Sequence, residues 1–173
     1  MRLVKQDKVV IKGSRMSSTL THALTDSIAA IIFAKVTPNE TPYIAAALVS
    51  ASIVDLDHLV FIIRDRELYR NSGYRGNLHH ARSVFHELIG LLLVAFVASI
   101  LYFWDQKLAF IVFIAFTLHL VQDWLLGKSH PFTPLSNVKV QFLNLTMKQK
   151  VVIDLVLMTV GGAVWLIYLS GHL

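Results

Sequence analysis

The fold of this chain is constrained most by apolar runs, separated by basic segments, that approach the length of a membrane span. The runs 43–63, 84–104, 108–126 and 151–169 each hold about 20 residues, which a helix needs to cross a bilayer. A shorter run, 19–36, precedes them. Only 16% of the residues are charged, against about 25% in soluble domains. We therefore predict an all-α fold, an integral membrane bundle of about five transmembrane helices.

The remaining composition limits partners and cofactors. The chain has no cysteine, which excludes disulfides, zinc-thiolate sites and iron–sulfur clusters, so a metal must be held by His, Asp, Glu or backbone oxygen. The net charge of +5 lies in blocks between apolar runs, so membrane lipid is the expected partner and nucleic acid is not. Residues 1–18 are predicted to be a basic arm, either touching anionic lipid or solvated, and 19–173 the membrane-embedded domain. A homo-oligomer is left open.

The basic residues predict an orientation. Lys and Arg number five in the arm, none after the first helix, five in 64–83, one in 105–107, four in 127–150 and none at the end. Because positive charge favours the cytoplasmic side, we expect a cytoplasmic N-terminus and an external C-terminus. The family resemblance described below implies that the membrane is a prokaryotic inner membrane.

Histidines and aspartates recur inside the apolar runs. His119 and Asp123 are four residues apart and share one helical face, as do His22 and Asp26. On the predicted topology each of the five helices contributes such residues at one depth, near the cytoplasmic leaflet. A single buried histidine is more often hydrogen-bonded than metal-bound, but six histidines and four aspartates in one layer indicate a divalent metal, with zinc favoured and two ions conceivable.

Roles follow from residue type and position. Asp26, Asp57 or Asp154 would orient a ligand or act as general base, and Arg82 could bind a phosphate oxygen or serve as an ordinary interfacial arginine. His130 could act as a mobile ligand or general acid, or be a plain loop residue. The expected metal ligands are His22, Asp55, His58, His80, His86, His119 and Asp123, with the choice between His79 and His80 left open.

The order of these motifs resembles a known family. The sequence has Thr21-His22, Asp55-Leu56-Asp57-His58, Arg82 with His86, and His119-x-x-x-Asp123 followed by Pro131-Phe132. In this order they resemble the YdjM-type family, described as inner-membrane, metal-dependent hydrolases regulated by LexA in some bacteria. The family pattern has His directly before the Arg, where this chain has Ala81. The family is in turn similar to zinc-dependent phospholipases C, which implies phosphoester hydrolysis.

These observations favour a membrane-embedded metal-dependent hydrolase, an enzyme that uses metal-activated water on a lipid phosphate or phosphodiester. Two alternatives use the same His/Asp cluster: haem binding by paired histidines, and proton- or metal-coupled transport. A non-catalytic assembly protein is a third. The sequence leaves the substrate and the metal undetermined.

Overall fold

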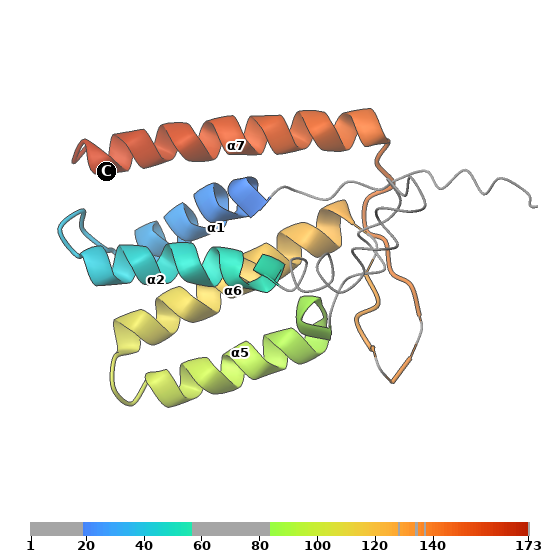
Figure 1. The fold of residues 1–173 in the computed structure, drawn as a ribbon, viewed down its shortest axis with the longest axis horizontal. Helices are drawn as coiled ribbons and strands as arrows, with labels where there is room; N and C mark the ends of the chain where they lie inside the picture. The colour runs from blue at the N-terminus through green and yellow to red at the C-terminus, as the bar shows by residue number, and fades with distance from the viewer. Residues whose placement is uncertain (1–18, 57–83, 128, 134, 137, 173) are drawn as a thin grey trace, which may run out of the picture.

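The computed structural model describes residues 19–56, 84–127, 129–133, 135–136 and 138–172. Within them it is helical, which confirms the predicted all-α class, and its one extended pairing is an isolated bridge between Ser129 and Val140. Figure 1 shows the elements side by side. The α-helices are α1 (Thr19–Phe33), α2 (Thr41–Ser52), α5 (Leu88–Leu101), α6 (Gln106–Leu126) and α7 (Met147–Leu169), and the 3₁₀ helices are η1 (Ile53–Asp55) and η3 (Val84–His86).

Two of these helices, α6 and α7, are long and apolar enough to cross a membrane. The other three are shorter: at about 1.5 Å per residue, the 15 residues of α1 extend about 22 Å, against the ~30 Å of a hydrocarbon core. The first helix ends at Phe33 and not at residue 36, because Lys35 adopts a positive φ of 51° that a right-handed helix cannot continue.

Two predicted helices are interrupted. The predicted helix 43–63 stops being α-helical at Ser52 and continues as the 3₁₀ helix η1, and its residues from 57 onward lie outside the described part. The predicted helix 84–104 is divided by Glu87, whose extended backbone separates η3 from α5. Both interruptions carry a buried residue that the sequence predicts for the site, Asp55 in η1 and His86 in η3.

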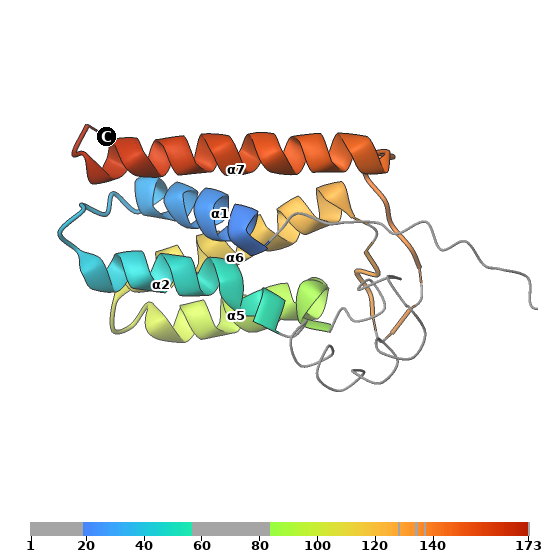
Figure 2. The ribbon, with the colours of Figure 1, turned by 45° about the horizontal axis from the view of Figure 1, so that its top comes forward.

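The helices pack around α1 and α6. α1 contacts α2, α6 and α7, whereas α6 contacts α1, α2 and α5. Accordingly, α7 lies at one edge and α5 at the other (Figures 1 and 2). Gly161 allows α7 to approach α1 closely, since a Cβ atom there would lie 3.0 Å from Cγ2 of Thr25. Small residues in a membrane-type helix permit such close packing, and in α7 Gly161 has this role.

The turns α1–α2 and α5–α6 lie together at one end of the bundle, which we call the far end (Figure 1). There Nζ of Lys107 bonds Oε1 of Glu40 at 2.7 Å, and the Tyr43 hydroxyl donates to Asp105 at 2.8 Å. The hydrogen bonds from Lys107 lower the pKa of the Glu40 carboxyl from 4.5 to about 2. Asp105 also caps α6 by accepting from the Leu108 N–H, so this helix begins at Gln106, before the predicted residue 108.

Candidate metal centre

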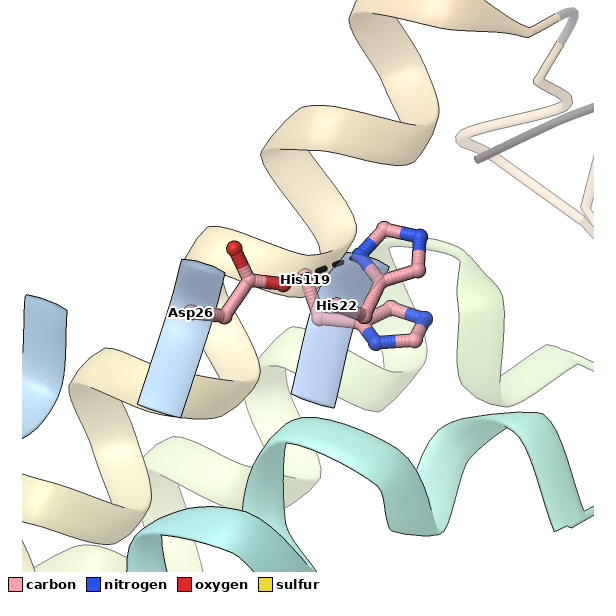
Figure 3. A group of neighbouring side chains, drawn as sticks. All are labelled: His22, Asp26 and His119. Carbon is pink, nitrogen blue, oxygen red and sulfur yellow. Dashed lines mark hydrogen bonds and ion pairs between the residues drawn. The ribbon is translucent and has the colours of Figure 1, made fainter. Parts of the chain in front are cut away.

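His22 and Asp26 form a hydrogen-bonded pair near the start of α1. Nδ1 of His22 donates to Oδ2 of Asp26 over 2.9 Å, and both side chains are buried (Figure 3). Asp26 also accepts from the Thr25 hydroxyl through its other oxygen, at 3.2 Å. Because one carboxylate oxygen of Asp26 holds Nδ1 of His22, the other ring nitrogen, Nε2, is the one that could bind a metal ion.

His119 is held in the same way, but by backbone. Its Nδ1 lies 2.7 Å from the carbonyl oxygen of Ala51, which can only accept, so Nδ1 carries the proton. Its Nε2 lies 3.6 Å from Oδ1 of Asp55 and 3.9 Å from Oδ2 of Asp123. The ring of His119 stacks on that of His22, with centroids 3.9 Å apart (Figure 3).

His86 and the aspartates complete the group from different elements. Nε2 of His86, in η3, lies 3.7 Å from Oδ1 of Asp55 and 3.8 Å from Oδ2 of Asp123. Nε2 of His22 lies 3.4 Å from the other oxygen of Asp123. Three imidazole nitrogens and two carboxylates therefore converge from α1, η1, η3 and α6. All five side chains are buried or nearly so.

The chemistry of this group fits a divalent cation. Two atoms bound to one tetrahedral zinc at about 2.0–2.2 Å are separated by roughly 3.3–3.6 Å, close to the 3.4–3.9 Å separations here. With Nδ1 protonated, His119 directs the lone pair of its Nε2 toward carboxylate oxygens, an arrangement that a cation between the acceptors would stabilise. Nε2 of His22 and of His119 make no hydrogen bond within the described part of the chain.

Two overlapping groups have ligand atoms close enough for one ion each. They are His22, Asp26 and His119, and Asp55, His86 and His119. In the first group Asp26 is already engaged with Nδ1 of His22, so we assign it the role of holding that imidazole. Asp123 faces all three histidines and therefore lies between the two groups.

The other residues predicted for the site have different positions. Asp154 accepts a 2.7 Å hydrogen bond from the Thr21 hydroxyl, which ties the start of α7 to the residue before His22. His130 follows α6, where its backbone N–H donates to Glu87. The predicted site residues that lie outside the described residues are Asp57, His58, His79, His80 and Arg82.

Sequence reasoning gave no role to Glu87, which the structure places beside His86. Its buried carboxylate accepts the His130 N–H at 2.9 Å, and the next residue, Leu88, donates its N–H to Pro131 O at 3.3 Å. The sequence does contain a signal for this role, because Glu87 is a carboxylate within an apolar run and directly follows the candidate ligand His86. The Ala51 carbonyl, which holds His119, could not be found from sequence because every residue has one.

The chain was compared with known proteins. No curated protein and no solved structure matches it. A family model, described as YdjM inner membrane protein, matches residues 16–171, nearly the whole chain and all five described α-helices. This match agrees with the motif order of the sequence and with two helices long enough to span a bilayer. The chain therefore belongs to the YdjM inner membrane protein family.

Proposed function

We propose that this protein is a membrane-embedded, metal-dependent hydrolase whose substrate is a phosphoester of a membrane lipid. The observation that carries the proposal is the convergence of three imidazole Nε2 atoms and two carboxylates in a buried, cysteine-free site. The residues that would hold metal are His22, Asp55, His86, His119 and Asp123. Zinc suits this mixture of nitrogen and oxygen ligands, and a second ion would need Asp26 as a ligand besides its bond to His22.

The chain contributes orientation and a dry environment. When bound, a divalent ion supplies a water whose pKa is lowered to about 7 and a polarised phosphoryl oxygen. Asp26 fixes His22, and the Ala51 carbonyl fixes His119, with Nδ1 protonated and Nε2 facing the carboxylates. Burial of the histidines strengthens every electrostatic interaction inside the site, because few water dipoles screen it.

Several features support a lipid phosphoester. Two of the proposed ligands, His119 and Asp123, lie on α6, which is long enough to span a membrane, and the flanking segments are basic, which suits an anionic substrate. Arg82 is the proposed contact for a phosphate oxygen. The positive-inside pattern supports a cytoplasmic N-terminus, which would place the site near the cytoplasmic leaflet. The similarity of the motif order to zinc-dependent phospholipases C supports phosphoester chemistry.

The haem alternative is not favoured by the geometry. Two imidazoles that ligate one haem iron approach it from opposite faces of the ring. The rings of His22 and His119 instead stack face to face, 24° apart, at 3.9 Å. Proton- or metal-coupled transport by the same His/Asp cluster is the second candidate function.

The test combines metal analysis with an activity screen on detergent-solubilised protein. We expect at least one tightly bound divalent ion per chain, lost when His119 and Asp123 are both replaced by Ala. His172→Ala is the matched control, because that histidine is exposed beyond α7. The metal-loaded protein should hydrolyse lipid phosphoesters, which are tested beside water-soluble phosphoesters, and the double variant should not. Wild-type metal stoichiometry in the double variant would overturn the proposal.

A further inference from the structure

Large apolar side chains are exposed along the segment that joins α6 to α7, which we call the α6–α7 connection. Leu135 is 91% exposed and Phe142 is 61% exposed. Loops usually carry polar residues outward, and a run of exposed apolar ones marks a surface that contacts lipid or protein. The exposed apolar residues of the connection are Phe132, Leu135, Val138, Phe142 and Leu143.

The connection is continuous with the two membrane-type helices. It leaves α6 after Leu126 and enters α7 at Met147, and both ends lie at the end of the bundle opposite the far end (Figures 1 and 2). A segment between two spans lies at the membrane surface. Lys139 in the connection and Lys148 in the first turn of α7 are exposed there, so this surface combines apolar groups with positive charge, as polypeptides that lie in an anionic interface do.

The connection is also fixed to the metal centre. Ser129 and Val140 pair through two backbone hydrogen bonds of 2.9 and 3.0 Å, which close the connection on itself. The His130 N–H then bonds Glu87, the residue after the ligand His86, and Pro131 O accepts from Leu88. The exposed apolar surface is therefore held beside the site by its own backbone.

We propose that the α6–α7 connection inserts its apolar side chains into the leaflet on the metal-centre side, with Lys139 and Lys148 at anionic headgroups. The partner is the lipid bilayer. This surface positions lipid at the mouth of the metal centre, so the substrate enters from the leaflet and not from water. The last step rests on the proposed function, whereas the insertion itself does not.

The absence of cysteine allows single labels to report the insertion. Leu135→Cys and Phe142→Cys would carry a nitroxide in vesicles of phosphatidylcholine and phosphatidylglycerol. The controls are Asn39→Cys, exposed at the far end, and Leu166→Cys, an exposed apolar position on α7. We expect accessibility to a water-soluble nickel chelate several-fold below that of Asn39→Cys and close to that of Leu166→Cys. Accessibility equal to Asn39→Cys, or dipolar coupling between labels on two chains, would overturn the proposal.

A second measurement tests substrate entry. Leu135→Asp and Phe142→Asp together should lower the ratio of lipid to water-soluble phosphoester turnover by about tenfold or more, at unchanged metal content. An unchanged ratio would overturn entry from the leaflet. If the wild-type protein hydrolyses neither substrate, the proposed function fails, and the nitroxide measurement still decides whether the connection is inserted.

Discussion

Asp26→Ala should weaken metal binding without abolishing it. The Asp26 carboxylate holds Nδ1 of His22 at 2.9 Å in a buried environment, so its loss frees the imidazole to rotate or to change tautomer. Removing a group that orients a metal ligand typically lowers metal affinity about 10- to 100-fold, or about 1.4–2.7 kcal/mol. Because His86, His119, Asp55 and Asp123 keep their positions, the number of ions at saturation should not change.

Competition with a chromophoric chelator, titrated with zinc in detergent, measures this affinity. Asp26→Asn is the matched variant: its amide oxygen still accepts from Nδ1, so we expect a smaller loss than for Asp26→Ala. Thermal unfolding of metal-free protein controls for damage to the fold. Unchanged affinity in Asp26→Ala would refute the orienting role. Loss of the ion as complete as in the His119/Asp123 double variant would show instead that Asp26 is itself a ligand.

Three further predictions test other parts of the molecule. Gly161→Val should lower the free energy of unfolding by about 1–3 kcal/mol, because its Cβ would press on Thr25 of α1. Gly162→Val is the control, because its side chain enters open space and should have a smaller effect. Equal shifts in melting temperature for the two variants would contradict this packing. Glu87→Ala should weaken Co²⁺ binding, measured by absorption, about tenfold or more, because the His130 N–H loses the acceptor that holds the residue beside His86. Glu87→Gln can still accept this N–H and should bind Co²⁺ nearly as tightly as the wild type. Equal losses of affinity in the two variants would refute a hydrogen-bonding role. The depressed pKa of Glu40 means that its ion pair with Lys107 stabilises the fold fully above pH 4.5 and loses this effect as the pH falls through about 2. The difference in melting temperature between wild type and Glu40→Gln should therefore shrink below pH 4.5 and vanish below pH 2.

The sequence was most informative where the relevant geometry is local. The spacing of His22 with Asp26, and of His119 with Asp123, is fixed by helical periodicity, and the structure places each pair on one helical face. The prediction that the histidines and aspartates lie at one depth followed from the alternation of basic segments alone, since these set the orientation of each predicted helix. The structure brings His22, Asp55, His86, His119 and Asp123 together within one buried group.

The sequence was least informative where tertiary contacts override local preference. The apolar run 84–104 reads as one helix, yet Glu87 is extended because its carboxylate bonds the His130 N–H more than 40 residues away. Asp55 likewise lies in a 3₁₀ turn within a run that reads as continuous helix. No period in the sequence encodes these breaks, since they depend on which segments meet in space.

The interruptions explain how short helices can build a shared site. In an uninterrupted helix, side-chain direction is set by the 3.6-residue period, so a ligand can be aimed only by rotating the whole helix and with it the packed face. Asp55 and His86 lie instead at the 3₁₀ ends of α2 and α5, where a few backbone dihedrals aim each side chain while the helix keeps its packing. His22 and His119 lie within regular helix and are adjusted by Asp26 and the Ala51 carbonyl. Of the five candidate ligands, two are thus fixed by hydrogen bonds on regular helices and two are aimed by irregular backbone, while the fifth, Asp123, lies one turn after His119 on α6. If Glu87 were regular helix, the side chain of His86 would point in another direction and leave the group, although no candidate ligand had been substituted.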